Sequence, residues 1–461
     1  MKAFSVSEPT STALRALNYS PIVETLRRRI GSSDAVSLSS LLSNLGDSYG
    51  SVFTRLDCDR EYGIELMSQS DMFSTEPCGR IIRRDSIPKP DAHRIRKWQL
   101  LIAGAGTLGE NELYGRSIVA DERHNGKYVG PDAVVLTFHE PGSISNIVAY
   151  TFFLTKVGVD VLRSASYGTK VLRIRQDILA SIPLPLLNKA ITARLTALIC
   201  QALQCREEYA AAIAKAREYI EALPEFGTAK SMFSRSGPRC LVWDKPLYTL
   251  SAWNYASAGE TLRYLQSVWP GRLADVVSSD DLFNGLRFAR IPCKEPYGVD
   301  LFSQRDVFSM RPLPRRIVHP GFDDRLLTVG GDSILVGSHG QLNDGSLFGR
   351  AELAMCEAAG SAVTQDILRI RPQPQHLETL YAFLSTDLGT RLLRSTAVGT
   401  SVPSMHLGLL AGLPIPDLSA DVGQQVRSQI RAAVSARQNA AKAEREASRI
   451  FQDEVLPEWL N

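Results

Sequence analysis

Two stretches of the chain carry apolar residues at alternating spacings of three and four, the first over about Lys189 to Leu223 and the second over about Val422 to Leu456. This 3.5-residue period places one continuous apolar seam along a helix, as a coiled coil requires. Each stretch is about 30 residues long, which as a helix spans roughly 45 Å. One such stripe alone would indicate packing against its own domain. Two copies favour a pair of long helices that bury their seams against each other as an antiparallel coiled coil.

The seam of the first helix is regular, whereas that of the second is rich in alanine and interrupted by Arg437 and Glu444. We expect the seam at Leu195 and Tyr209 to face the seam at Ile430 and Ala441. The residues predicted to contact the partner helix are Leu195, Leu198, Tyr209, Tyr219, Val426, Ile430, Val434 and Phe451.

The rest of the chain mixes short helices with short β-branched runs that are bounded by Gly, Pro, Asn and Asp, a pattern typical of strands. The predicted strands lie in residues 79–85, 98–104, 132–142, 315–321 and 332–338, and the predicted helices in residues 19–28, 147–163, 255–265 and 377–394. Each long helix follows a P-x-P motif, PLPLL or PIPDL. Proline disfavours helix at the preceding residue, so these motifs predict extended connectors.

The whole pattern occurs twice. YGIELMSQSDMFS (62–74) returns as YGVDLFSQRDVFS (297–309), with eight of thirteen positions identical. LNYSPIVETLR (17–27) returns as WNYASAGETLR (253–263), and YTFFLTKVGVDVLRSASYGT (150–169) as YAFLSTDLGTRLLRSTAVGT (381–400). A period of more than 230 residues indicates a duplicated domain, not a solenoid repeat.

We therefore predict an α+β fold made of two similar bodies, each followed by a long helix. The expected divisions are a first body over 1–187, a first long helix over 188–227, a second body over 228–418 and a second long helix over 419–461. The 461 residues are enough for two cores.

Composition is that of an ordinary globular protein, with 44% hydrophobic and 22% charged residues. No apolar run reaches the length that crosses a bilayer, and the N-terminus lacks the apolar core of a secretory signal, so we expect a cytoplasmic protein. The seven cysteines form no C-x2-C pair and do not cluster with the seven histidines. They indicate neither a zinc site nor a disulfide framework.

One motif suggests a nucleotide. Gly104, Gly106 and Gly109 form a G-x-G-x-x-G pattern after a predicted strand, as in dinucleotide-binding folds. The repeat tests this reading, because the corresponding residues are Ser338, Gly340 and Asn343. We interpret the glycines as a turn. No phosphate loop, metalloprotease motif or Ser/His/Asp set occurs, so we predict a non-catalytic chain with no metal and no cofactor of its own.

Clusters of arginine and lysine follow the S-Q-x-D-x-F-S block in both halves. Arginine binds guanine bidentately and neutralises phosphates, so this shared segment indicates a DNA-binding face. For any single residue of the set, a solvated surface position is the simpler explanation. The candidates are Arg80, Arg83, Arg84, Lys89, Arg94, Arg96 and Lys97 in the first half and Arg311, Arg315, Arg316 and Arg325 in the second.

The duplicated order of body, Gly-Thr turn, P-x-P connector and long helix resembles the specificity (S) subunit of type I restriction-modification systems. The residues that carry the resemblance are the strand-turns at 100–106 and 332–340, the turns and connectors at 168–187 and 399–418, and the two long helices. Together they cover nearly the whole chain.

The resemblance implies a target recognition domain in each body, which reads one half of a bipartite DNA site, with the paired helices as a spacer. It also implies two copies of an adenine methyltransferase subunit as partners, and allows for a restriction or translocase subunit. The loops of the two bodies differ, so we expect an asymmetric site. Two alternatives stay open: a specificity-like subunit of another phage-defence complex with a different effector, and a stand-alone enzyme that uses the Gly104 loop.

Overall fold

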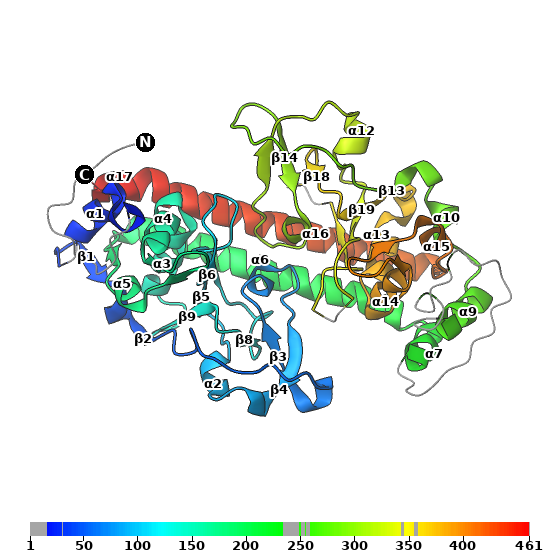
Figure 1. Cartoon of the computed structure of the whole chain (residues 1–461), viewed down its shortest axis with the longest axis horizontal. Coiled ribbons are helices and arrows are strands. Elements are labelled where there is room, and N and C mark those ends of the chain that lie inside the picture. Colours follow the sequence, from blue (N-terminus) through cyan, green and yellow to red (C-terminus); the bar gives the residue numbers. More distant parts are fainter. Residues whose placement is uncertain are drawn as a thin grey trace. The chain divides into compact units, whose positions relative to one another are not determined.

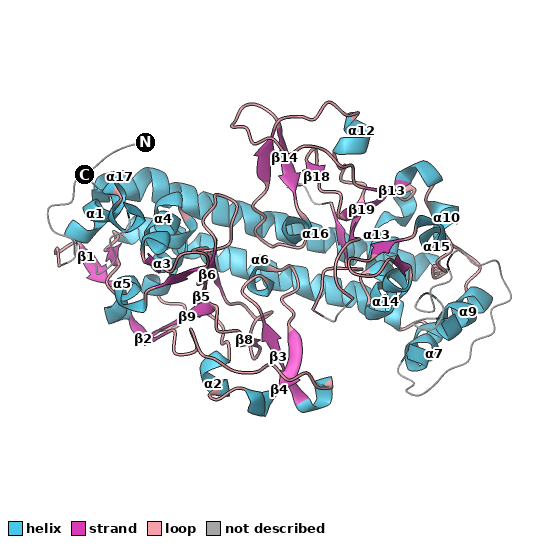
Figure 2. Cartoon of the chain, in the orientation of Figure 1, coloured by secondary structure: helices cyan, strands magenta, loops and turns pink. Residues whose placement is uncertain are grey.

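The computed structural model (Figures 1 and 2) describes residues 16–460 except 30, 234–248, 250–253, 255–258, 343–344 and 355–357. The chain forms two compact units: unit 1 contains residues 1–207 and 439–461, and unit 2 contains residues 208–438. The predicted divisions set the long helices apart as segments of their own. The compact units instead divide each long helix, so that each unit contains one part of both.

Unit 1 mixes helices with small sheets. Its strands form a four-stranded antiparallel sheet in the order β2-β9-β5-β7, two three-stranded sheets, β4-β3-β8 and β10-β11-β6, and the two-stranded sheet β1-β12. The strands are β1 Ala35–Ser37, β2 Leu42–Leu45, β3 Gly63–Met67, β4 Arg80–Arg83, β5 Leu100–Ala103, β6 Ala105–Gly106, β7 Ser117–Val119, β8 Tyr128–Val129, β9 Ala133–Phe138, β10 Ser166–Tyr167, β11 Leu172–Ile174 and β12 Pro183–Pro185. The shorter helices are α1 Pro21–Arg28, α2 Pro90–His93, α3 Ile144–Leu154, α4 Lys156–Ser164 and α5 Gln176–Ala180.

Unit 2 repeats the two larger sheets, as β13-β19-β16-β17 and β15-β14-β18, beside a β20-β21 hairpin. The strands are β13 Leu282–Asn284, β14 Val299–Phe302, β15 Arg315–Ile317, β16 Ile334–Gly337, β17 Ala351–Leu353, β18 Ala362–Val363, β19 Ile367–Ile370, β20 Ala397–Val398 and β21 Ser404–Met405. The helices are α7 Pro224–Phe233, α9 Gly259–Val268, α10 Leu273–Val276, α11 Gln304–Val307, α12 Asp324–Leu327, α13 Leu377–Leu384, α14 Asp387–Ser395 and α15 Leu407–Ala411. The predicted α+β fold and its five predicted strands are confirmed, while part of the predicted helix at 255–265 lies outside the described residues.

The predicted helices at 147–163 and 377–394 are wrong in one respect, because each is broken into two. In unit 1 the chain bends by 90° between α3 and α4 at Thr155, whose hydroxyl accepts a hydrogen bond of 3.0 Å from the Gly158 amide. Thr386 caps α14 in the same way through Gly389. A Cβ at Gly158 would collide with the Phe152 carbonyl oxygen, so glycine is needed at this corner.

The long helices are α6 (Lys189–Glu221) and α16 (Ala420–Ile450), and α16 continues through a π-helical turn (Phe451–Val455) into α17 (Leu456–Leu460). Within unit 1, Arg194 pairs with Glu454 and Arg206 pairs with Glu444. From Arg194 to Arg206 the chain advances by twelve residues, whereas their partners go back by ten residues, from Glu454 to Glu444. The two helices run antiparallel in this unit, as the sequence predicts.

The apolar seam is buried, but its partners differ from those expected. Leu195 shares the core of unit 1 with Ile450 and Phe451, whereas Tyr209 shares the core of unit 2 with Ile430. Leu195 therefore does not face Ile430. Among the residues predicted to contact the partner helix, five are buried and three are half-buried: Leu195, Tyr209, Val426, Ile430 and Phe451, and then Leu198, Tyr219 and Val434. Ala441 is only half-buried, because Ala440 and Ala443 take the inward positions.

No single helix in the described ranges has both the length and the apolar composition to span a membrane; only α3 and α4 taken together across their bend reach these values.

Candidate nucleic-acid interface

Part of each predicted basic segment lies on an equivalent sheet of its unit, in β4 and in β15. In unit 1, β4 pairs antiparallel with β3 and places Arg80 opposite Leu66. In unit 2, β15 pairs with β14 in the same register and places Arg315 opposite Leu301. Arg80 and Arg315 are thus structural equivalents, each on the edge strand of a three-stranded sheet. The arginines on β4 and β15 thus occupy equivalent strands of the two units.

Most of the arginines of this segment in unit 1 are paired with aspartate. The pairs are Arg80 with Asp57, Arg83 with Asp85, and Arg84 with Asp91. The hydrogen bond from Arg80 lowers the pKa of the Asp57 carboxyl, and the bond from Arg83 does the same for Asp85. Exposed pairs of this kind stabilise a fold only weakly. The arginines can therefore exchange their aspartate for another anion at little cost to the fold.

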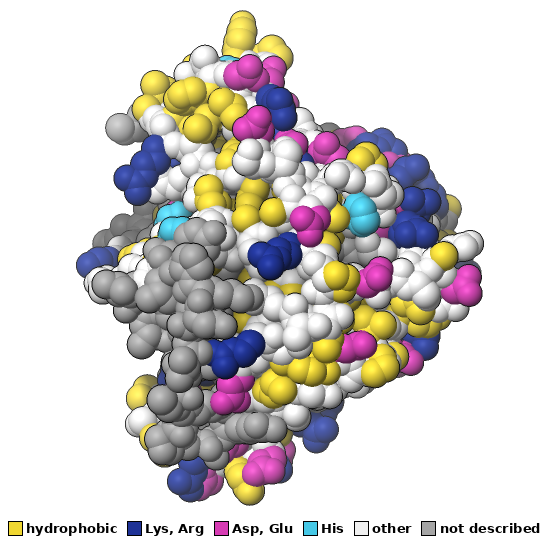
Figure 3. Space-filling model, turned by 90° about the vertical axis from the view of Figure 1, so that its right-hand side faces the viewer, with side chains coloured by type: hydrophobic (Ala, Val, Ile, Leu, Met, Phe, Trp, Pro, Cys, Tyr) yellow, Lys and Arg dark blue, Asp and Glu magenta, His cyan; other side chains and the backbone are white. Residues whose placement is uncertain are grey.

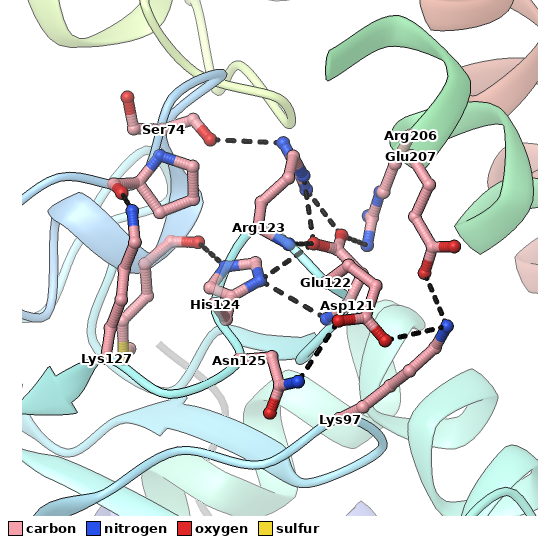
Figure 4. A network of polar contacts seen from close by, with 12 residues as sticks. Ser74, Lys97, Asp121, Glu122, Arg123, His124, Asn125, Lys127, Arg206 and Glu207 are labelled. Carbon is pink, nitrogen blue, oxygen red and sulfur yellow. Dashed lines mark hydrogen bonds and ion pairs between the residues drawn. The ribbon is translucent and has the colours of Figure 1, made fainter. Parts of the chain in front are cut away.

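The other four candidates of unit 1 lie further along the same segment. Lys97 binds Glu122 at 3.3 Å and Glu207 at 2.8 Å, which ties it to the middle of α6 (Figure 4). Lys89, Arg94 and Arg96 are exposed, and no carboxylate in the described part of the chain pairs with them. These three are the free cations of the predicted cluster in unit 1.

In unit 2 the four candidates are less uniform. Arg316 binds Asp300 at 3.0 Å and donates to the Tyr297 carbonyl, while Arg325 binds Asp281 at 3.1 Å. Arg315 is exposed and Arg311 is half-buried. The face drawn in Figure 3 likewise mixes dark-blue lysine and arginine side chains with acidic and hydrophobic ones. On this face the basic side chains therefore do not form one continuous patch.

A buried polar network joins the body of unit 1 to α6. Asp121 lies between Arg123, at 2.6 Å, and the Nδ1 atom of His124, at 3.0 Å (Figure 4). Burial alone would raise the pKa of Asp121, but the guanidinium of Arg123 and the ring of His124 hold this pKa far below its usual value. Arg206, whose side chain is fully buried, approaches the same carboxylate at 3.9 Å.

Arg206 also binds Glu444 of α16, and Glu444 accepts a hydrogen bond from the Tyr150 hydroxyl of α3. Burial acts against the charge of Arg206, but the carboxylate of Glu444 and its other neighbours raise the pKa of the guanidinium above its usual value. One buried cation therefore joins α6, α16 and the body of unit 1.

Unit 2 contains a similar network, in which the buried arginine lies on α16 instead of α6. Arg437 of α16, at the repeat position of Arg206, lies 3.5 Å from Glu352 of β17. Glu352 accepts hydrogen bonds from Tyr381, the equivalent of Tyr150, and from Tyr209 of α6. The sequence analysis treated Arg437 and Glu444 as interruptions of the seam. They are instead buried anchors, and the spacing of 231 residues between two arginines in long helices was the signal that could have identified them.

The glycine loop is explained by packing. Gly106 lies in β6, which pairs with β11, and a side chain at Gly104 would collide with the Tyr49 ring and the Asp132 carbonyl. Tyr49 donates a hydrogen bond of 2.8 Å to the Gly104 carbonyl. Asn343, one of the compared positions, lies outside the described residues. Close contacts within unit 1 thus account for Gly104 without a nucleotide.

No group of three or more His, Cys, Asp or Glu side chains that could hold a metal ion occurs among the described residues. None of the five described cysteines forms a disulfide, and Cys240 and Cys356 lie outside the described residues.

No family model matches the chain, and no curated protein is similar to it in sequence. Among solved structures, it is similar to a type I restriction-modification S subunit from M. genitalium, with 13% identity, coverage of 94% of this chain and 97% of that one, and a TM-score of 0.28. The HsdS subunit from Thermoanaerobacter tengcongensis has 16% identity, coverage of 91% and 95%, and a TM-score of 0.27. A third structure, which concerns complex assembly and conformational transition of the type I R-M system, has 16% identity, coverage of 93% and 97%, and a TM-score of 0.26.

Proposed function

We propose that this chain is the specificity subunit of a type I restriction-modification system. In this role it binds double-stranded DNA at a bipartite, asymmetric site in the cytoplasm and directs an adenine methyltransferase to that site. The observation that carries the proposal is the duplicated three-stranded sheet, with an arginine-bearing edge strand in each unit. Two copies of one scaffold suit a ligand that offers two similar but distinct segments, as a bipartite DNA site does.

Differences between the edge strands support an asymmetric site. Arg83 of unit 1 corresponds to Val318 in unit 2, and Arg316 of unit 2 corresponds to Ile81 in unit 1. Base edges in the major groove are read by the position of each donor, so arginines displaced along the strand select different sequences. The shared scaffold thus supplies the same mode of binding, and the unshared arginines supply different half-sites.

The assignment of partners rests on the long helices and on the resemblance found in the sequence. Each long helix is anchored within a unit through a buried arginine and has exposed residues that other subunits can contact. We propose two methyltransferase subunits on these faces, with a restriction or translocase subunit joining through them. The methyltransferase brings the catalytic groups and the methyl donor, and this chain contributes recognition alone.

The experiment that tests the proposal is a map of methylated adenines in the genome of the source organism. We expect one bipartite motif to be methylated in the parent strain and unmethylated after deletion of this gene, with methylation restored by the gene on a plasmid. If deletion leaves every adenine-methylation motif in place, the chain does not direct a methyltransferase. If a motif is lost but the associated effector is not a type I nuclease, the related phage-defence alternative is supported.

A further inference from the structure

A loop before the arginine-bearing sheet is repeated more closely than the basic segment itself. Residues 50–63 (GSVFTRLDCDREYG) align with residues 285–298 (GLRFARIPCKEPYG), with six of fourteen positions identical. The identical pairs are Gly50 and Gly285, Phe53 and Phe288, Arg55 and Arg290, Cys58 and Cys293, Tyr62 and Tyr297, and Gly63 and Gly298.

Both copies of the loop are held against the edge strand by the same backbone contacts. The Arg83 amide donates to the Leu56 carbonyl at 2.8 Å, and the Val318 amide donates to the Ile291 carbonyl at 2.8 Å. Isolated bridges at Asp57–Ile82 and Pro292–Ile317 occupy equivalent places as well. Arg55 and Arg290, each just before these contacts, therefore occupy equivalent positions of the backbone.

Packing explains several of the identities. The Phe53 ring packs edge-on against the His93 ring, with 5.4 Å between the ring centroids. The Phe288 ring packs against the Phe322 ring, with 6.2 Å between the centroids. A Cβ at the last glycine of each loop would collide with the cysteine sulfur, since Gly63 packs against Cys58 and Gly298 against Cys293. The phenylalanine, the cysteine and the last glycine are thus accounted for by contacts within each unit.

Packing does not explain Arg55 and Arg290. Both are exposed, and neither forms an ion pair or a side-chain hydrogen bond with any residue in the part of the chain that is described. The nearby edge-strand residues Arg80 and Arg316 behave differently, because each pairs with an aspartate. Nη2 of Arg55 lies beside Gly130, 3.7 Å from the position of a Cβ there.

Identical residues at identical places have the same task in both units. If the two units read different half-sites, a shared residue cannot discriminate between them, and it contacts what all DNA sequences have in common. Protein contacts to phosphate fix position and register, and contacts to base edges supply specificity. A free arginine is suited to phosphate because its donors are fixed in a planar fork.

We propose that Arg55 and Arg290 each bind a backbone phosphate of the DNA duplex, at equivalent places on the two half-sites and without regard to sequence. This inference rests on the proposed function, since it requires that both units bind DNA. It assigns two anchoring residues that the basic segment did not include.

The test is the salt dependence of binding of the purified full chain to two mixed-sequence DNA duplexes of unrelated sequence. Each phosphate contact that is lost lowers the slope of log K against log salt concentration by about 0.9. We expect this decrease for Arg55→Ala and for Arg290→Ala, and about twice this decrease for the double variant. The loss should be equal on both duplexes, and Arg55→Lys should retain most of the slope because it keeps the charge.

Arg60→Ala is the matched control. Arg60 is exposed in the same loop, but its counterpart in unit 2 is Glu295. The proposal therefore does not assign Arg60 a phosphate contact that both units share. An unchanged melting temperature in every variant shows that the fold is intact. The inference is overturned if the wild-type chain binds DNA but the double variant keeps its slope, or if Arg60→Ala loses as much. If neither the wild-type chain alone nor its complex with the methyltransferase subunits binds a duplex, the proposed function fails, and this inference fails with it.

Discussion

Replacement of Arg206 by alanine should destabilise unit 1 strongly. The Arg206 side chain is fully buried, and its partners are nearly so, with Glu444 exposed by 7% and Asp121 by 0%. After the substitution Asp121 keeps Arg123 and His124, whereas Glu444 loses the guanidinium that pairs with it and keeps the hydrogen bond from the Tyr150 hydroxyl. Removing one partner of a buried ion pair costs about 3–5 kcal/mol, because the remaining charge stays buried without compensation.

Two further variants separate this effect from simple loss of packing. Changing both Arg206 and Glu444 to methionine removes the two charges together, and such replacements are commonly close to neutral. Arg194→Ala breaks a second pair between α6 and the C-terminal segment, in which the arginine and Glu454 are exposed by 48% and 36%. Screening by solvent makes that pair weak, so we expect a much smaller loss.

The measurement is hydrogen exchange of backbone amides, which reports the free energy of opening for each part of the chain. Amides of β5 and β9 report on unit 1, and those of β16 and β19 serve as a control in unit 2. We expect Arg206→Ala to lower protection in β5 and β9 and to leave β16 and β19 unchanged. A loss below about 1 kcal/mol, or a double variant as unstable as the single one, would refute the assignment of Arg206 as a paired buried charge.

Two more predictions follow from local structure. Gly158→Ala and Gly389→Ala should each destabilise their own unit by about 1–3 kcal/mol, because the added Cβ collides with a carbonyl oxygen at a helix corner. Chemical denaturation would detect this loss as a lower midpoint of unfolding. An unaltered midpoint would contradict the prediction. Burial lowers the pKa of His93, so the imidazole binds a proton more readily in the unfolded chain than in unit 1. The contribution of the neutral imidazole to stability should therefore be complete above the unfolded pKa of about 6.5 and should decline as pH falls through that value. His93→Gln should remove this pH dependence, and a decline of the same size in the variant would assign it to another group.

The fold was predictable to the extent that it depends on local pattern and on the repeat. The 3.5-residue period predicted α6 and α16, and the β-branched runs predicted the main strands, because both signals arise within one element. The corner at Thr155 was missed because α3 and α4 form one nearly continuous apolar run, and the Thr-to-Gly cap that divides them has no periodic signature.

Partners that are distant in the sequence account for the other differences. Glu444 looked like a defect in a seam because its partners, Arg206 and Tyr150, are 238 and 294 residues away. The arginine cluster looked uniformly basic because the sequence does not show that Asp57 pairs with Arg80, 23 residues on. Arg55 was not predicted as a DNA-binding residue because it lies outside the clusters of arginine and lysine in the sequence. Only the structure shows that it forms no ion pair with any described residue.

The adenine methylation map tests the central claim most directly. The account predicts that strains with and without this gene differ by one motif only, composed of two unlike halves separated by a fixed gap, with one methylated adenine in each half. Each half would correspond to one unit. A symmetric motif would contradict the inference of two different half-sites, and the absence of any lost motif would contradict the assignment as a specificity subunit.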